Sequence, residues 1–298
     1  MSRFLITSMA LVFGISGICQ ENKTRKELID KDAKVTKAGG GYIFTEGPSV
    51  APDGRVFFTD QPNDKIDIWD EGGTINTFLQ PCDRSNGTYF NKKGELVTCA
   101  DLHNRLVAIN MDKQMRTLAE NFEGKPLNAP NDLWISPNGG IYFSDPYYHR
   151  GYWETGRKEV QDKRGVYYLN PEGKVIRVID DYKQPNGLIG TPDGKTLYVS
   201  DINDGKIWKY SINADGTLTN KTFFAPEGSD GMTIDNKGNI YLTNKVVSVF
   251  NPEGKNIARI EVPEQPSNIC FGGKKRNILF ITARTSVYTL KMKVKGVQ

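Results

Sequence analysis

Histidine is scarce in this chain, since its 298 residues contain only His103 and His149. A zinc site built on several histidines and a histidine-rich proton relay are therefore excluded. The sequence also lacks a G-x-S-x-G element, which argues against a serine hydrolase of the nucleophile-elbow type. His103 stands in a stretch expected to be a loop, where both a pocket position and a surface position fit its surroundings.

Long hydrophobic runs are absent apart from one at the N-terminus. Arg3 precedes an apolar stretch over residues 4–19, which is too short to span a membrane but has the length of a secretory h-region. We therefore expect residues 1–19 to be a cleaved signal peptide and the protein to be exported, either to the periplasm or into the medium. A lipoprotein acylated on Cys19 is the alternative, although Ile18 stands where a lipobox has Gly or Ala.

Cysteine is rare as well. After removal of the expected signal peptide, the chain keeps Cys82, Cys99 and Cys270, and three cysteines cannot all pair with one another. The mature protein is therefore not a disulfide scaffold. Cys99 and Cys270 lie in strand-like runs, so we expect both to be buried as small hydrophobic side chains.

No strong excess of one charge is present. The formal net charge of +4 comes from 39 basic and 35 acidic residues scattered along the chain. A nucleic-acid surface would need a concentrated basic face, so we expect no nucleic-acid partner. No linker divides the sequence, and one large domain over residues 20–298 is the simplest organisation.

Helical periodicity is missing after residue 40, and a repeated phrase takes its place. Each copy has a polar residue, a short apolar strand, a turn such as Pro-Asp-Gly, and a second strand that often ends on Ser/Thr-Asp. The six copies begin at Glu46, Asn86, Asn131, Asn186, Asp230 and Asn268. They start 38 (268 − 230) to 55 (186 − 131) residues apart, and further strands follow most of them. This period with about four strands per unit predicts an all-β, six-bladed β-propeller.

The first residue of each copy always carries a side-chain oxygen. In a propeller, equivalent ends of the innermost strands converge at one mouth of the central channel, which would bring two carboxylates and four carboxamides together. Such oxygens describe a site for one hard divalent cation. Ca²⁺ fits best, because it accepts six to eight oxygens in loose geometry. Mg²⁺ and Mn²⁺ are alternatives, and Zn²⁺, which favours nitrogen and sulfur, is the least suited.

A simpler interpretation needs no metal. Asn-Gly and Asp-Gly are common turn dipeptides, and a turn at the start of each blade would produce the same pattern. Glu is a poor turn residue, and its presence at position 46 in register with the amides favours the ligand interpretation.

The repeats also carry specific motifs. These are TEGP at 45–48, LNAPND at 127–132, GVY at 165–167, QPNGL at 184–188, SDGM at 229–232 and FITARTS at 280–286. With them, residues 43–290 resemble the regucalcin/gluconolactonase family of six-bladed propellers, which includes lactonases and, more distantly, diisopropyl fluorophosphatase and the paraoxonases. The resemblance implies that the cation is held by Glu46, Asn131, Asn186 and Asp230, with Asn86 and Asn268 outside its ligands.

The resemblance further implies hydrolysis of a sugar lactone, such as a gluconolactone, to its aldonic acid. A cation at the channel mouth can polarise the lactone carbonyl, while a carboxylate activates water. Asp230 is our candidate for that carboxylate, and Glu46 would chiefly hold the ion. Asn128, Asn131 and His103 are expected to contact the substrate. Ala129 stands where some animal relatives have an arginine for the substrate.

Two other functions fit the same scaffold. One is a phosphotriesterase-like hydrolase, in which the same aspartate attacks phosphorus. The other is a calcium-stabilised binding propeller without catalytic activity. Loss of the carboxylates would favour the binding propeller, and both Glu46 and Asp230 are present. The aromatic-rich stretch that begins at residues 145–153 lengthens the third repeat and is expected either to cap a pocket or to cover blade edges.

Overall fold

A computed structural model describes residues 27–298 of the protein. The signal peptide expected over residues 1–19, and with it Cys19, lies outside the described residues. Within the described part of the chain, no helix is both long enough and apolar enough to cross a bilayer.

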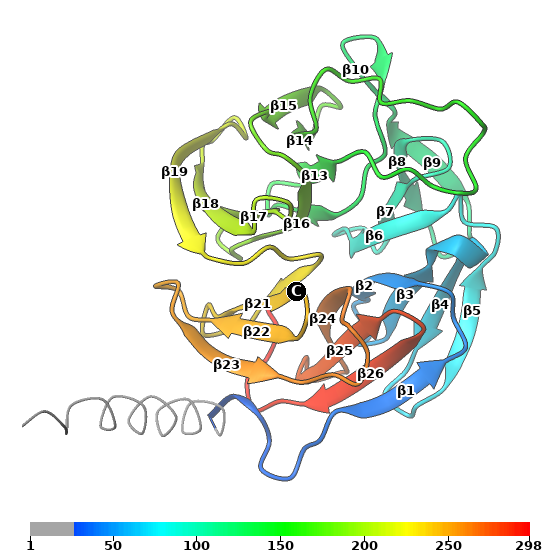
Figure 1. Ribbon diagram of the computed structural model, residues 1–298. Helices are drawn as coiled ribbons and strands as arrows, with labels where there is room; N and C mark the ends of the chain where they lie inside the picture. Colours follow the sequence, from blue (N-terminus) through cyan, green and yellow to red (C-terminus); the bar gives the residue numbers. More distant parts are fainter. Residues whose placement is uncertain (1–26) are drawn as a thin grey trace, which may run out of the picture.

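Six antiparallel four-stranded sheets are arranged around a central channel, so the predicted six-bladed propeller is confirmed (Figure 1). The first three blades comprise β2 (Thr45–Val50), β3 (Val56–Asp60), β4 (Lys65–Trp69), β5 (Ile75–Leu79); β6 (Ser85–Phe90), β7 (Leu96–Ala100), β8 (Arg105–Ile109), β9 (Met115–Ala119); and β12 (Leu133–Ile135), β13 (Ile141–Asp145), β14 (Gly165–Leu169), β15 (Val175–Ile179).

The remaining three blades complete the ring. They comprise β16 (Pro185–Gly190), β17 (Thr196–Asp201), β18 (Lys206–Ile212), β19 (Leu218–Ala225); β20 (Met232–Ile234), β21 (Ile240–Thr243), β22 (Val247–Phe250), β23 (Asn256–Ile260); and β24 (Asn268–Gly272), β25 (Ile278–Ala283), β26 (Ser286–Lys291), β1 (Thr36–Gly40). Outside the blades are the short pair β10 (Asn121–Phe122) and β11 (Lys125–Pro126) and the 3₁₀ helix η1 (Gln61–Asn63).

The core lies between the faces of neighbouring sheets. The second strand of a blade is buried on both faces, as the fully buried β3, β7 and β13 show. One hydrophobic cluster joins Val97 and Leu106 of blade 2 to Phe143 and Tyr167 of blade 3. Within blade 3, the rings of the cross-strand neighbours Phe143 and Tyr167 stack with centroids 5.5 Å apart. Packing between sheets explains why β-branched and aromatic residues dominate both halves of each repeat.

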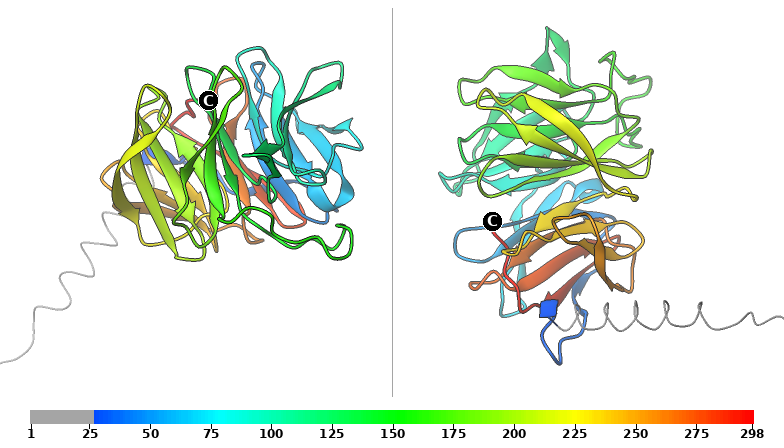
Figure 2. Two further views of the ribbon diagram at one scale, coloured as in Figure 1. Left: turned by 90° about the horizontal axis from the view of Figure 1, so that it is seen from above. Right: turned by 90° about the vertical axis from the view of Figure 1, so that its left-hand side faces the viewer.

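The innermost strands β2, β6, β12, β16, β20 and β24 contact one another in sequence around the channel, and β24 returns to β2. Figure 2 shows the sheets from two sides, with their connecting loops at the two ends of the channel. The C-terminus lies near the centre of the ring (Figure 1).

The ring is closed by strands from opposite ends of the chain. β1 pairs antiparallel with β26, for example Thr36 with Thr289, and supplies the outermost strand of the sixth blade. Hydrogen bonds from the backbone N–H groups of Tyr42 and Thr45 to Thr285 and Arg284 extend the closure. The first and last blades are therefore joined by backbone hydrogen bonds as well as by packing.

Cys82, Cys99 and Cys270 are all buried and free. Cys99 lies in β7 and Cys270 in β24. The prediction that these two residues act as small core side chains is confirmed.

Candidate functional site

The first residues of the six repeats meet at the end of the channel where the innermost strands begin. Four of the six lie inside a strand, with Glu46 in β2 and Asn186 in β16 among them, while Asn131 and Asp230 come just before β12 and β20. Asn86-Gly87 and Asn186-Gly187 therefore lie in strands and not in turns, whereas Asp230-Gly231 forms a bend before β20. The interpretation of the repeat without a metal stays a hypothesis. The hairpin turns lie at the opposite ends of the strands, as at residues 51–54.

A β-bulge interrupts the innermost strand at this end in three blades. The pairing shifts between Glu46 and Ser49 in β2, and equivalent shifts occur in β6 and β16. A bulge leaves residues out of the ladder and changes the direction of a side chain. In β6 and β16 the bulge leaves Asn86 and Asn186 out of the ladder, whereas in β2 it directly follows Glu46, which pairs with Thr59.

The glycine after the polar residue allows the innermost strands to approach closely. A Cβ atom on Gly187 would lie 2.6 Å from the carbonyl oxygen of Asp230, and one on Gly231 would lie 1.9 Å from Oδ1 of Asn268. Side chains cannot be accommodated at such distances. The recurring Gly thus reflects contact between neighbouring blades at the channel mouth.

Hydrogen bonds connect the predicted ligands to one another. Nδ2 of Asn186 donates to Oδ1 of Asp230 at 2.8 Å. Nδ2 of Asn268 donates to Oε2 of Glu46 at 3.1 Å, and the same oxygen accepts the N–H of Gly47. Asn268 therefore orients Glu46, and its place outside the ligands stays a prediction.

The predicted ligand Asn131 stands at the equivalent strand start in blade 3. It is buried, and its carbonyl oxygen accepts the N–H of Gly87 at 2.8 Å. This backbone contact fixes Asn131 against blade 2 and leaves its side chain at the channel end of β12.

Three carboxyl groups share this mouth, and the guanidinium groups of Arg150 and Arg284 act on Asp230 alone among them by lowering its pKa. Burial raises the pKa of Glu46 well above its usual range, and the neighbouring Asp230 raises it further. Burial also raises the pKa of Asp230 to about 6 and that of Asp132 to about 7. Repulsion between the ionised carboxylates favours either their protonation or the binding of a cation at this mouth.

Asp132 was not predicted as part of the site. It occupies the position that is Gly in four of the other repeats, and its Oδ1 accepts the N–H of Leu133 at 2.9 Å. The sequence signal for Asp132 was therefore a carboxylate at a repeat position where four other blades have glycine.

The donor atoms fit a hard cation. Oδ1 of Asn186 is buried and has no hydrogen-bond partner among the described residues, which is the state expected of an oxygen that ligates a metal. No group of three or more His, Cys, Asp or Glu side chains in residues 27–298 has a metal-binding arrangement. A cation at this mouth would therefore need the amide oxygens in addition to Glu46 and Asp230.

The structure gives two of the predicted substrate contacts partners elsewhere. Oδ1 of Asn128 accepts the N–H groups of Val160 and Gln161, both at 2.9 Å, while its Nδ2 is buried without a partner. The side chain of His103 is 63% exposed and its Nδ1 pairs with Asp83. A substrate role for either residue stays a prediction.

Residues 146–164, which we call the blade 3 insertion, contain no helix or strand. In Figure 1 this segment passes across the second blade. It brings Tyr148 to the site, because Nδ2 of Asn186 donates to the Tyr148 hydroxyl at 2.8 Å. The aromatic-rich sequence suggested a cap over a pocket, but it did not indicate that Tyr148 would contact a predicted metal ligand.

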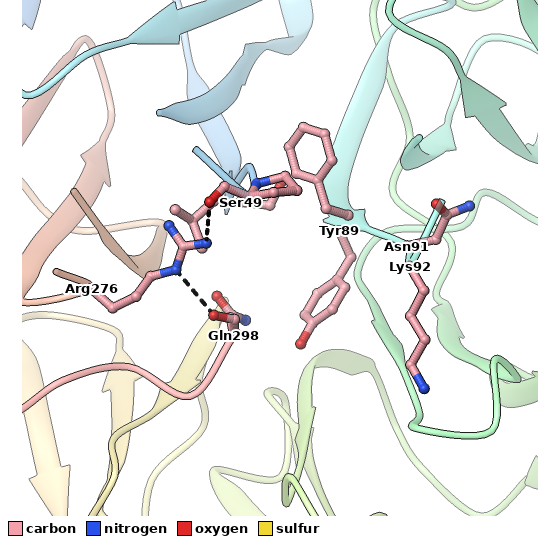
Figure 3. Close-up of a pocket in the computed structure, with 9 residues that line it drawn as sticks. Ser49, Tyr89, Asn91, Lys92, Arg276 and Gln298 are labelled. Carbon is pink, nitrogen blue, oxygen red and sulfur yellow. Dashed lines mark hydrogen bonds between the residues drawn. The ribbon is translucent and has the colours of Figure 1, made fainter. Parts of the chain in front are cut away.

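The other end of the channel has a different cavity, of about 170 Å³ (Figure 3). It is lined by Ser49, Tyr89, Arg276 and Gln298, among others. Nε of Arg276 donates to the carbonyl oxygen of Gln298 at 3.2 Å. No Asp or Glu side chain lines this cavity.

Comparison with known proteins places this site in a family. The model of the SMP-30/gluconolactonase/LRE-like region matches residues 44–285. The chain belongs to this family. A gluconolactonase of Zymomonas mobilis is 28% identical over 300 residues, covering 90% of this chain and 84% of that protein.

Two further proteins are similar in structure or sequence. The structure of a gluconolactonase from Xanthomonas campestris superposes with a TM-score of 0.82 at 27% identity, covering 89% of this chain and 91% of that one. A diisopropyl-fluorophosphatase of Loligo vulgaris is 27% identical over 218 residues, covering 67% of this chain and 66% of that protein.

Proposed function

We propose that this protein is a metal-dependent hydrolase that opens a sugar lactone to its aldonic acid, as a gluconolactonase does. The observation that carries the proposal is the buried, unpartnered Oδ1 of Asn186 beside the carboxylate of Asp230. Relatives named gluconolactonase over most of the chain support the same reaction.

In this proposal, Glu46, Asn131, Asn186 and Asp230 hold one divalent cation. Ca²⁺ is our choice, since carboxylate and carboxamide oxygens in a loose arrangement suit it better than Mg²⁺, Mn²⁺ or Zn²⁺. The bound cation would supply Lewis-acid polarisation of the lactone carbonyl. Glu46, held by Asn268 and its own backbone, acts as an anchor.

Asp230 acts as the general base. It accepts a proton from a water molecule, whose oxygen forms a bond to the carbonyl carbon of the lactone. The bond between that carbon and the ring oxygen then breaks, and the proton passes from Asp230 to the departing oxygen. The product carries a new hydroxyl group and a carboxylic acid, which releases a proton at neutral pH.

A panel of sugar lactones with a pH indicator tests the proposal. We expect acid release above the spontaneous rate in Ca²⁺, loss of this activity in EDTA, and recovery when Ca²⁺ is returned. Asp230→Asn in Ca²⁺ serves as the control for activity from contaminants. Spontaneous rates on every lactone would contradict the proposal and favour a calcium-stabilised binding propeller.

A second candidate is hydrolysis of phosphotriesters or fluorophosphates, favoured by the similarity to the squid diisopropyl-fluorophosphatase. Asp230 would then attack phosphorus directly and form a covalent phosphoryl-enzyme. Hydrolysis in ¹⁸O-labelled water under single-turnover conditions separates the two reactions. If Asp230 attacks phosphorus and expels fluoride or an alkoxide, and water then attacks the carboxyl carbon of the phosphoryl-enzyme, the first turnover places the label in Asp230. If Asp230 acts as a base, the label appears only in the product and no phosphoryl-enzyme can be trapped by acid quenching.

We also propose that the protein is exported with cleavage close to residue 19. Mass spectrometry of the exported protein should show the N-terminal residues missing. Retention of the full N-terminus would contradict the signal peptide, and acylation of Cys19 would favour the lipoprotein instead.

A further inference from the structure

The blade 3 insertion is held over the channel mouth by hydrogen bonds to blade 2. Nε of Arg150 and the hydroxyl of Tyr152 donate to Oδ2 of Asp101 at 3.0 and 2.6 Å. The guanidinium of Arg157 donates to the carbonyl oxygens of Asp101 and Leu102 at 3.2 and 3.1 Å. The insertion is thus anchored at one turn of the neighbouring blade.

In three other blades, the aspartate that ends the second strand has a different role from Asp101. Asp60, Asp145 and Asp201 each end the second strand of a blade, and each accepts two backbone N–H groups from the loop that enters the innermost strand. Each of these carboxylates holds the entering loop against its own blade, because it accepts hydrogen bonds from backbone N–H groups of an irregular segment.

Blade 2 departs from this arrangement. Its entering loop is held instead by Asp64 of blade 1, whose Oδ1 accepts the N–H groups of Cys82 and Arg84 at 3.0 and 2.6 Å. The position equivalent to these aspartates in blade 2 is Ala100, which pairs with Ser85 as Asp60 pairs with Thr45. Asp101 is the next residue; it is 1% exposed and accepts hydrogen bonds from Gln61 and from the insertion. Its carboxylate is thus the attachment point of a segment at the site.

The attached segment presents the hydroxyl of Tyr148 to the ligands. That hydroxyl accepts a hydrogen bond from Nδ2 of Asn186, so its own hydrogen remains to be donated. The guanidinium of Arg150 lies 5.3 Å from the centre of the Tyr148 ring and connects it to Asp101.

We propose that Tyr148 contacts the substrate by donating its phenolic hydrogen to an oxygen of the lactone, and that Asp101 is the positioning residue that holds it there. The inference rests on the proposed lactone hydrolysis. It adds a donor beside Asn186 and Asp230, supplied by the blade 3 insertion and not by the repeat.

Tyr148→Phe removes the donor and keeps the ring. A hydrogen bond to an oxygen that gains negative charge in the reaction is worth about 10- to 100-fold, so kcat should fall by this factor with little change in KM. The matched control is Tyr147→Phe, because the Tyr147 hydroxyl donates only to the carbonyl oxygen of Arg157 within the insertion. Equal activity of the two variants would overturn the contact.

Asp101→Asn tests the positioning role through a double-mutant cycle. If Asp101 acts through Tyr148, the substitution lowers kcat in the wild-type background but causes little further loss in Tyr148→Phe. A purely structural role would give the same loss in both backgrounds and would contradict the assignment. Should Asp101→Asn fail to fold, Tyr152→Phe removes one anchoring hydrogen bond and should show the same coupling on a smaller scale.

Calorimetric binding of gluconate in Ca²⁺ separates failure of the contact from failure of the proposed function. Weaker binding by Tyr148→Phe than by Tyr147→Phe supports the contact even if no lactone is hydrolysed. Hydrolysis by the wild type with indistinguishable variants overturns the contact alone. A wild type that neither hydrolyses a lactone nor binds gluconate overturns both.

Discussion

The two ends of the innermost strands differ in construction, although the same few residues span both. At the end that carries Glu46 and Asp230, β-bulges and glycines allow neighbouring blades to approach closely, and buried carboxylates lie close together. At the other end the pairing is regular, and the cavity beside Ser49 and Tyr89 has no acidic side chain.

The difference shows how a repeated fold can separate stability from chemistry. Repulsion between Glu46, Asp132 and Asp230 disfavours the metal-free folded state, whereas the interblade hydrogen bond between Ser49 and Thr88 stabilises the ring a few residues away. Changes at the first end should therefore alter catalysis and metal response. Changes at the second end should alter stability alone.

The largest effect is expected for Asp230→Asn. The amide keeps an oxygen for the cation but cannot accept a proton from water, and a positioned base is worth about 10²- to 10⁴-fold. We expect kcat to fall by this factor and to stay low at saturating Ca²⁺, measured with the lactone on which the wild type is most active.

Glu46→Gln is the matched variant for that measurement, because it also removes one negative charge. Its activity should recover largely as Ca²⁺ is raised, since Glu46 only anchors the ion. Full recovery of both variants at high Ca²⁺ would show that Asp230 is not the base.

The response of melting temperature to Ca²⁺ should depend on pH. In the metal-free protein the raised pKa values of Asp230 and Asp132, about 6 and 7, exceed those of the unfolded chain. The stability contributed by their neutral forms is complete below about pH 4 and is lost as the pH rises through 6 to 7. Ca²⁺ needs the ionised groups, so its stabilisation should be larger at pH 8 than at pH 5.

The size of that effect follows from mass action. Free Ca²⁺ at 100 times Kd stabilises by about 2.7 kcal/mol, which corresponds to several degrees in Tm for a domain of this size. Glu264, whose pKa is lowered to about 2 chiefly by hydrogen bonds to Ser286 and Thr285 that outweigh its burial, does not change charge in this window. Equal shifts at pH 5 and pH 8, in protein shown to be metal-free beforehand, would argue against the carboxylate site.

Gly231→Ala tests the close approach of the strands. The new methyl group would overlap the Asn268 amide that orients Glu46, and overpacking costs about 1–3 kcal/mol. We expect a Tm lower by a few degrees and weaker Ca²⁺ binding, measured by melting and calorimetry. Gly151→Ala is the control, because that position has open space, and a comparable loss there would contradict the explanation.

The smallest effect is expected at the opposite end. Tyr89→Phe removes a hydroxyl that is hydrogen-bonded to Gln298 and Trp134, and the loss of such a bond costs about 1 kcal/mol. Tm should fall by a few degrees, while kcat and KM stay at their wild-type values. A change in kcat would show that the two ends of the channel are coupled.

The repeat made the fold predictable from the sequence, since six copies of one phrase determine the number of blades and which strand lies innermost. It also identified Glu46, Asn186 and Asp230, whose contacts the structure shows. The reason for the recurring glycine was not predictable, because the bulges and the contact of Gly231 with Asn268 depend on the neighbouring blade.

Residues that depart from the repeat pattern were harder to place. Asp132 stands at a repeat position that is Gly in four other blades, and Tyr148 lies in the blade 3 insertion. Both join the site through tertiary contacts. Asn128 and His103 were expected to contact substrate, and both have partners that a single sequence does not reveal. Periodic positions could be predicted from the sequence, whereas loop side chains depend on which neighbouring blade they meet.

The pairing of β1 with β26 joins strands from the two extremes of the chain. Loop closure over such a separation has a high entropic cost, and contacts of this kind slow folding. During synthesis the sixth blade cannot be completed until β26 has been made, so the other five blades can form while the ring is still open. A circular permutant that starts between two other blades would move that delay to another blade boundary and leave the finished ring unchanged.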